Sequence, residues 1–141
     1  MSIFSYMVKN DNTTPTLVSN DSNLEERRQN VFNITNKYPD MCPVYITRAS
    51  TQRYDKKLTL KKYKYLIPKD NQFCQLTQFI RSRLDISYSE GLYFYVVKRN
   101  TSQPGTIPPM NMNMGELYNN EKDEDGFLYI VYQTENTFGF C

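Results

Sequence analysis

Residues 61–84, KKYKYLIPKDNQFCQLTQFIRSRL, contain a short strand that is followed closely by an amphipathic helix. Tyr63–Ile67 is a short apolar piece typical of a strand, and Pro68 ends it because proline has no N–H for a sheet ladder. Asp70 is the expected cap of the helix. The apolar residues of the helix form one stripe, which we predict to be core: Phe73, Leu76, Ile80 and Leu84, with Phe79 beside them.

A second helix is predicted upstream of this segment, between a cap at Asn23 or Ser22 and a stop at Pro39. Its apolar residues lie near one side of a 3.6-residue period. They are Leu24, Val31, Ile34 and Tyr38.

Further strands are predicted on both sides of the 61–84 segment. Val44–Thr47 is β-branched and aromatic, which favours a strand beside Tyr63–Ile67. Leu92–Val97 is an uninterrupted run of strand formers, which favours a central strand over an exposed edge. The loop Lys98–Pro109, with its three prolines and Gly105, is expected at the surface.

The C-terminal part adds a short helix and a last strand. The helix opens at Asn111 or Asn113, and Asp125-Gly126 turns the chain into the strand Phe127–Tyr132. A strand pair, a helix and two more strands indicate an α+β fold. Periodicity alone leaves a β-grasp and ferredoxin-like arrangements open.

The length of 141 residues is that of a single domain. Residues 1–22 are rich in Asn, Thr, Ser and Asp, and we expect a mostly flexible N-terminal arm whose few apolar residues could dock. The longest apolar runs, Leu92–Val97 and Phe127–Tyr132, are far shorter than the roughly 20 residues that cross a bilayer. With no leader-like N-terminus, the chain is expected in the cytosol, where Cys42 and Cys74 stay reduced as small core residues.

The composition argues against catalysis. The chain has no histidine, which removes the commonest general base and the commonest metal ligand. The segment after Lys122 resembles a calcium loop only superficially, because the twelfth position counted from Asp123 is Thr134 and not a bidentate carboxylate. We expect no enzyme activity, no metal and no cofactor.

Charge is distributed unevenly, although the net charge is only +2. Arg48–Lys69 holds eight basic residues and one acid, whereas Glu116–Glu135 holds six acids and one base. Such a basic stretch suits nucleic acid, an anionic membrane or acidic peptides, or it is simply a solvated face.

Two C-terminal segments, KDEDGFLYIVY at 122–132 and ENTFG at 135–139, resemble the end of the autophagy ubiquitin-like modifiers, the GABARAP-type family. The similarity continues through KKYKYLIPKD at 61–70, the helix Gln72–Leu84 and KYPDMCPV at 37–44, and it covers roughly residues 24–139. It implies a ubiquitin-like β-grasp with one or two extra N-terminal helices. The domain is then 23–139, with a removable tail at 140–141.

The resemblance also implies a conjugation pathway. A cysteine protease removes Phe140-Cys141, activating and carrier enzymes hold Gly139 as thioesters, and the chain ends amide-linked to phosphatidylethanolamine. A glycine suits this chemistry because no Cβ crowds its carbonyl. The expected locations are the cytoplasm and, once lipidated, the autophagosome or vacuole membrane.

A second implied activity is docking of cargo receptors and adaptors through short aromatic-x-x-aliphatic motifs, added as a strand to the sheet edge. Basic residues, Lys62, Lys64 and Arg83, would pair with acids of such motifs. The implied aromatic pocket comprises Asn30, Ile34, Pro43, Tyr45, Lys64, Leu66 and Phe127. The implied aliphatic pocket comprises Tyr65, Ile67, Pro68, Leu76, Phe79 and Arg83.

Several departures from the family pattern keep alternatives open. Asn71 stands where an apolar pocket residue is usual, the loop Thr51–Leu60 is about three residues longer than usual, and Lys98–Thr106 carries about five extra. Tyr93-Phe94-Tyr95 matches a stretch that can serve as another docking face, but a buried central strand explains these residues as well and is the interpretation that we favour. The alternative functions are a non-conjugated peptide-binding adaptor of the same fold and a nucleic-acid or cytoskeleton binder that uses Arg48–Lys69; we expect no nucleic acid.

Overall fold

A computed structural model describes residues 4–5, 23–49, 56–87, 90–99, 101 and 104–134. Every helix and strand predicted from the sequence is present, and the two-residue strand β1 and the 3-10 turn η1 are additional. The elements are β1 Phe4–Ser5, α1 Leu24–Lys37, β2 Met41–Arg48, η1 Lys56–Leu58, β3 Lys64–Pro68, α2 Phe73–Arg83, β4 Leu92–Val97, α3 Met114–Glu121 and β5 Leu128–Thr134.

The strands form one mixed sheet in the order β1-β3-β2-β5-β4. The neighbours β2 and β5 run parallel, with Val44 opposite Leu128 at the start of the ladder. The other pairs are antiparallel. A β2-β3 hairpin, a helix and a last strand that returns parallel to the first strand of the hairpin make a β-grasp, so the predicted α+β fold is confirmed.

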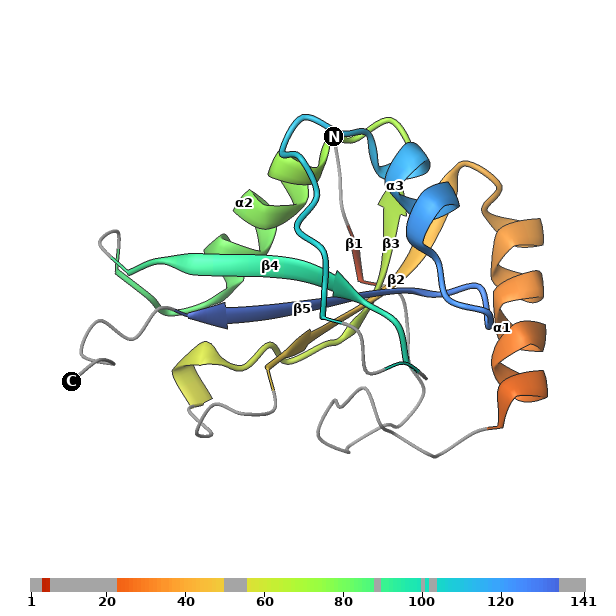
Figure 1. The fold of residues 1–141 in the computed structure, drawn as a ribbon, viewed down its shortest axis with the longest axis horizontal. Coiled ribbons are helices and arrows are strands. Elements are labelled where there is room, and N and C mark those ends of the chain that lie inside the picture. Colours follow the sequence, from red (N-terminus) through yellow and green to blue (C-terminus); the bar gives the residue numbers. More distant parts are fainter. Residues whose placement is uncertain are drawn as a thin grey trace.

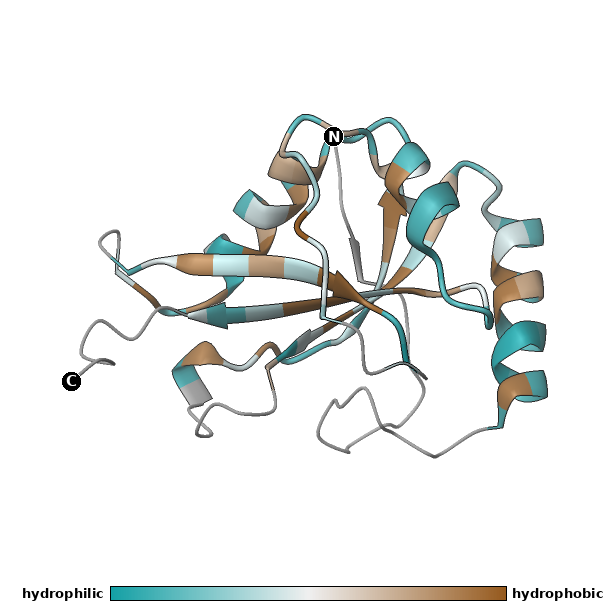
Figure 2. Ribbon diagram, in the orientation of Figure 1, coloured by the Kyte–Doolittle hydropathy of each residue, from teal (hydrophilic) through white to brown (hydrophobic). Residues whose placement is uncertain are grey.

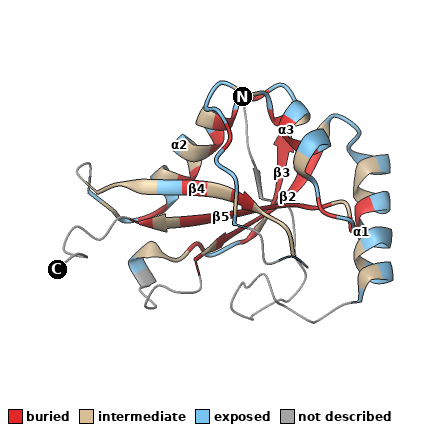
Figure 3. Cartoon of the chain, in the orientation of Figure 1, coloured by how far each residue is buried: buried red, intermediate tan, exposed pale blue. Residues whose placement is uncertain are grey.

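The two faces of the sheet carry different cores. Helices α2 and α3 cover one face, above the strands in Figure 1, and alternate strand residues point toward them to build the main core. On the other face a smaller cluster consists of Val31 from α1 with Tyr45, Tyr63, Phe127 and Tyr129. Figure 3 shows the buried positions concentrated in the strands and on the inner sides of α2 and α3. We refer to these as the α2 face and the α1 face.

Strand β4 is an edge strand, so the prediction of a central strand at Leu92–Val97 was wrong. Its outer side is covered instead by the chain that follows. The Val96 N–H donates to the Thr106 carbonyl at 2.8 Å, and the Thr106 N–H donates to the Val96 carbonyl at 2.9 Å. Phe94 and Val96 point into the main core, whereas Tyr93 is 48% exposed. The segment around Thr106 lies where a second neighbouring strand would lie, which explains why this edge strand is a continuous apolar run.

Two helix starts show how side chains satisfy the free N–H groups of a first turn. At α1, Asn23 Oδ1 accepts the Glu26 N–H at 2.8 Å, as predicted for Asn23. At α2 the cap is Gln72 and not Asp70, because Gln72 and Gln75 form a reciprocal capping box. The prediction at Asp70 was therefore wrong by two residues.

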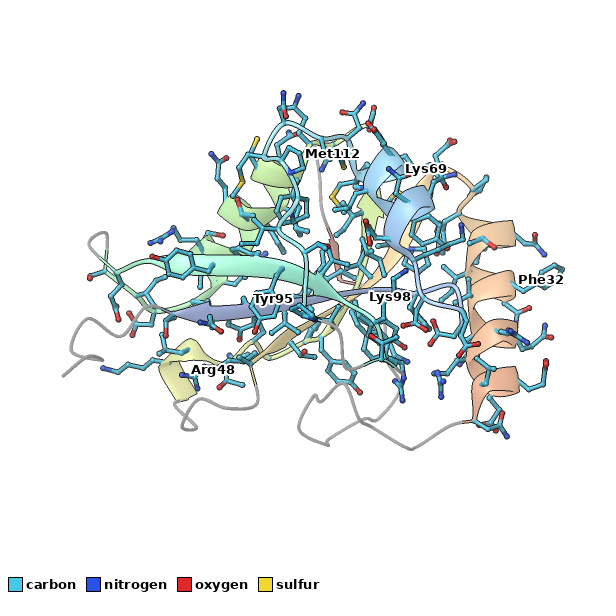
Figure 4. The ribbon with its side chains drawn as sticks, in the orientation of Figure 1. Phe32, Arg48, Lys69, Tyr95, Lys98 and Met112 are labelled. Atoms are coloured by element: carbon cyan, nitrogen blue, oxygen red, sulfur yellow. The ribbon has the colours of Figure 1, made fainter. Side chains whose placement is uncertain are left out.

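Helix α1 is largely hydrophilic and stands at one end of the sheet (Figure 2). Val31 is its one buried residue, and Phe32 is 58% exposed and points away from the sheet (Figure 4). Within the described part of the chain, no helix has the length and apolar character that crossing a membrane requires.

Candidate functional site

The backbone of β3 directs every second pair of hydrogen-bonding groups away from β2, toward the side on which β1 lies. Ile46 N–H donates to the Tyr63 carbonyl and Lys69 N–H to the Asp40 carbonyl, so odd-numbered residues of this strand face β2. Antiparallel ladders alternate, and the N–H groups of Lys64 and Leu66 therefore point outward. Pro68 occupies the next outward position and has no N–H. This outward side of Lys64–Pro68 is the β3 edge.

On the α1 face, aromatic rings gather beside the β3 edge. Tyr45 packs edge-on against Phe127 with ring centroids 4.8 Å apart, and Ile34 of α1 packs on the same cluster. The ammonium of Lys64 lies 5.4 Å from the Tyr45 ring centroid and 6.0 Å from that of Phe127. Four of the predicted aromatic-pocket residues are thus brought together.

The other three predicted aromatic-pocket residues are not members of this cluster. Pro43 and Leu66 are opposite each other in the β2–β3 register, and both are buried. Because they are two positions from Tyr45 and Lys64 along their strands, they share the α1 face. Asn30 is exposed on α1, one residue before Val31.

On the α2 face, Tyr65 and Phe79 form the matching aromatic pair. Their ring centroids are 6.0 Å apart in an edge-on arrangement, and the Arg83 guanidinium lies 4.9 Å from the Phe79 ring centroid. The Tyr65 hydroxyl donates to the Lys62 carbonyl at 2.9 Å. Burial raises the pKa of Tyr65 to about 12, with a further contribution from Tyr132 that Arg83 opposes.

The remaining aliphatic-pocket residues differ in how accessible they are. Ile67 and Leu76 are fully buried members of the main core. Pro68 and Phe79 are half-buried, and Arg83 is exposed. Any ligand on this face would therefore meet Phe79, Pro68 and Arg83 at the surface, above a floor of core residues.

Asn71 introduces a polar group at the start of α2. The residue is 6% exposed, and its Nδ2 has no hydrogen-bond partner within the described part of the chain. Its backbone carbonyl accepts the Met114 N–H at 2.7 Å, which holds α2 against α3. A buried amide left unpaired costs about 1–3 kcal/mol, so Asn71 destabilises this corner relative to an apolar residue.

A polar anchor that the sequence analysis missed fixes α1 to the sheet. Arg27 Nε donates to Asp125 Oδ2 at 2.8 Å, and the Tyr129 hydroxyl donates to the same oxygen at 2.5 Å. Burial lowers the pKa of Arg27, but hydrogen bonding and attraction to Asp125 outweigh it and the net pKa is raised. The Asp125-Gly126 dipeptide indicated only a turn, and nothing in the sequence pattern linked it to a helix 98 residues earlier.

Gly126 allows this anchor to lie close to α1. Its φ of 96° is in the left-handed region. A Cβ built on Gly126 would approach Val31 Cγ1 to 2.6 Å. The turn therefore needs glycine both for its backbone conformation and for its contact with the helix.

The remaining expectations concern charge, metals and the C-terminus. Lys62 and Arg83 are exposed and Lys64 is half-buried, and we refer to these three basic residues as the basic rim of the β3 edge. Across the described ranges, no group of three or more His, Cys, Asp or Glu side chains is placed to hold a metal ion. Gly139, Phe140 and Cys141 lie outside the described residues.

An extended peptide added to the β3 edge as a strand would take the position that β1 has in the sheet. Neighbouring residues of a strand point to opposite faces, so two residues three positions apart also point to opposite faces. A ligand paired with the β3 edge would place one of two such residues on the α1 face and the other on the α2 face. This geometry fits an aromatic residue followed three positions later by an aliphatic one.

Comparison with known proteins places the chain among similar sequences and folds. The family model "Autophagy protein Atg8 ubiquitin like" matches residues 26–139. Autophagy-related protein 8e of Arabidopsis thaliana is 35% identical over 119 residues, covering 84% of this chain and 89% of that protein. Autophagy-related protein 8c of the same plant is 38% identical over 116 residues, 82% and 89% of the two chains. The crystal structure of Trypanosoma brucei ATG8 superposes with a TM-score of 0.67 at 25% identity, covering 82% of this chain and 90% of that one.

Proposed function

Because the chain belongs to the Atg8 family of ubiquitin-like autophagy proteins, we propose that it is a lipid-conjugated modifier that docks short peptide motifs at the β3 edge. The observation that carries the docking activity is the position of the β3 edge, between an aromatic cluster on the α1 face and Tyr65 with Phe79 on the α2 face. The conjugation rests on Gly139, which is the last residue that the family model matches.

The conjugation would follow the chemistry of a C-terminal carbonyl. A cysteine protease hydrolyses the bond between Gly139 and Phe140 and leaves a free carboxylate. The activating enzyme would adenylate this carboxylate with ATP, releasing pyrophosphate, and its thiol would displace AMP to form a thioester. The glycine then passes to the thiol of the carrier enzyme by thioester exchange. The amine of phosphatidylethanolamine attacks the thioester carbonyl, which releases the carrier thiol and leaves an amide. A lipid with two acyl chains anchors a protein stably where one chain gives marginal binding. The chain would therefore move from the cytoplasm to an autophagosomal or vacuolar membrane.

Gly139→Ala tests the conjugation because it adds a Cβ beside the reacting carbonyl. In starved cells, we expect the wild-type chain to lose Phe140-Cys141 and to give a second, faster-migrating lipid-linked band. The variant should give neither product and should stay off membranes. Mass spectrometry of both proteins checks the C-terminus. Unchanged membrane recruitment of the variant would instead favour the non-conjugated adaptor.

Docking is supported by the chemistry around the β3 edge. Main-chain pairing to Lys64 and Leu66 supplies affinity that does not depend on ligand sequence, and the two faces supply selectivity. The basic rim of Lys62, Lys64 and Arg83 suits motifs that carry acids, and it would mainly increase the association rate. Cargo receptors and adaptors with such motifs are the proposed partners.

Lys64→Pro tests the docking because it removes one outward N–H of β3 and leaves the odd-numbered positions that pair with β2. Lys64→Gln is the matched control, since it removes the charge and keeps the N–H. We expect the proline variant to bind an acidic peptide with a Trp-x-x-Leu core about tenfold more weakly than the glutamine variant, the value of roughly one hydrogen bond. Fluorescence anisotropy measures both affinities, and equal affinities would argue against strand addition at this edge.

A further inference from the structure

The β3 edge carries a strand from the chain's own N-terminus. In β1, Phe4 is opposite Leu66 and Ser5 is opposite Tyr65, and the pairing is antiparallel. The two strands are hydrogen-bonded neighbours at the end of the sheet order. Figure 1 shows β1 alongside β3, on the side away from β2. This pairing uses the same backbone edge that a docked motif would use.

The register of β1 matters because β3 has few outward donors. Lys64 and Leu66 provide the two outward N–H groups of the strand, and Pro68 provides none. Phe4 is opposite Leu66, one of these two positions. A peptide strand that needs the outward groups of Leu66 therefore has to displace β1.

The sequence around β1 has the spacing of a docking motif. Phe4-Ser5-Tyr6-Met7 places an aromatic residue three positions before methionine, a flexible apolar side chain. The register puts Phe4 opposite Leu66, which is a position of the α1 face. The backbone pairing of the segment is therefore centred on a β3 residue that belongs to the face with the aromatic cluster.

The charge around β1 indicates a weak occupant. Residues 1–9 contain no acid, and Lys9 is basic. The rim of the β3 edge is also basic, so the N-terminal segment has no charge complementary to it. A motif preceded by acids has an electrostatic attraction to this rim that the N-terminal segment lacks. Two paired residues are also far shorter than an independently stable strand. Displacement by an acidic motif is therefore expected.

We propose that Phe4–Ser5 is an internal pseudo-ligand that occupies the β3 edge and competes in cis with acidic aromatic-x-x-aliphatic peptides. This inference rests on the proposed docking function and assigns it a regulation. The competitor lowers the apparent affinity of every external motif by the fraction of molecules in which the edge is open. The fold reduction is the same for motifs with and without acids, because it depends only on how often β1 occupies the edge.

Phe4→Pro in the full-length chain tests the competition, because proline removes the N–H that position 4 offers to the ladder. Ser19→Pro is the control, with the same substitution in the same N-terminal segment away from β1. The probe is a fluorescein-labelled peptide with a Trp-x-x-Leu core after three glutamates. If β1 holds the edge in about nine-tenths of molecules, Phe4→Pro binds the probe about tenfold more tightly than wild type and Ser19→Pro binds like wild type.

Hydrogen exchange of the Leu66 amide gives a readout that does not depend on the probe. We expect this amide to exchange at least several-fold faster in Phe4→Pro than in wild type, because its outward partner is lost. The inference is overturned if all three proteins bind the probe equally, which leaves the docking function intact. It is also overturned if the gain disappears on dilution, because β1 would then bridge two copies. If no protein binds the probe, the docking function fails and the inference fails with it.

Discussion

The two edges of the sheet are closed by the chain in different ways. At the β4 edge, Val96 and Thr106 exchange two backbone hydrogen bonds, and the intervening connection is short. At the β3 edge, the cover is β1, which is about sixty residues away in sequence from its partner strand. Closing a longer loop costs more conformational entropy, so the second cover is easier to lose. A strand edge without a partner is a template for an added strand. When β1 leaves, the β3 edge becomes such a template, between the two faces whose side chains could select a ligand.

Asp125→Asn should have the largest effect, because it weakens the anchor that holds α1 beside the β3 edge. The Asp125 side chain is fully buried and that of Arg27 is only 11% exposed, so the substitution removes the negative charge that faces a nearly buried cation. We expect about 3 kcal/mol less free energy of unfolding, measured by urea denaturation.

Glu25→Gln is the contrast, since it breaks the exposed pair between Glu25 and Arg28, whose atoms are 3.8 Å apart. We expect no measurable change from it. Similar urea midpoints for the two variants would mean that the anchor contributes nothing beyond an exposed ion pair.

Gly105→Ala should have the next largest effect and should act at the other edge. A Cβ at this position would lie 2.5 Å from Tyr95 Cδ2 and 2.9 Å from the Val96 carbonyl oxygen, so the cover of β4 must shift. We expect a loss of about 2 kcal/mol, typical of an overpacked contact. Peptide binding at the β3 edge should stay unchanged.

Gly115→Ala is the matched glycine variant. Its Cβ would lie 3.2 Å from the Lys69 Cβ, and the residue is within α3, where alanine is the better helix former. Its unfolding midpoint should stay closer to wild type than that of Gly105→Ala. The reverse order would show that the 104–106 segment does not cover β4 tightly.

Among the variants expected to lose stability, Tyr65→Phe should lose less than Asp125→Asn or Gly105→Ala, and its loss should depend on pH. The pKa of Tyr65 is raised by burial to about 12, from the ordinary value near 10. The stabilisation linked to the protonated hydroxyl is therefore complete below pH 10 and is lost as the pH rises toward 12. At neutral pH the variant should lose about 1 kcal/mol with the hydrogen bond to Lys62.

The stability gap between Tyr65→Phe and wild type should narrow between pH 10 and pH 12, because only wild type has this hydroxyl to ionise. Urea denaturation at pH 8 and pH 11 measures the gap. A constant gap would show that Tyr65 ionises in the folded state without cost.

The comparison of the two edges also shows what the sequence could and could not reveal. Local periodicity located the strands and helices because each depends on residues near in sequence. Local periodicity gave Leu92–Val97 the wrong position in the sheet. An apolar run shows that a strand is covered on both sides, but not whether the second neighbour is another strand or a loop such as 104–106. The predicted cap at Asp70 failed for a related reason, because Gln72 and Gln75 offered a reciprocal pair that satisfies two N–H groups.

The candidate site divides in the same way. The pocket residues came from family resemblance, and the structure places Tyr45, Lys64 and Phe127 together on one face and Tyr65 with Phe79 on the other. The ion pair of Arg27 with Asp125 and the pairing of β1 with β3 join segments distant in sequence. No local pattern signals such contacts. The role of Gly139 stays a prediction.

Pro68, the last residue of β3, limits how far any strand can pair along the β3 edge. Beyond Leu66 the β3 edge has no further N–H group, because Pro68 lacks one. An added strand, however long, can therefore form backbone hydrogen bonds with this edge over only a few residues. So few backbone hydrogen bonds cannot distinguish one ligand from another. Selectivity has to come from the two ligand side chains that contact the two faces of the sheet and from the ligand charges next to them. A few substitutions in a ligand are then enough to gain or lose binding.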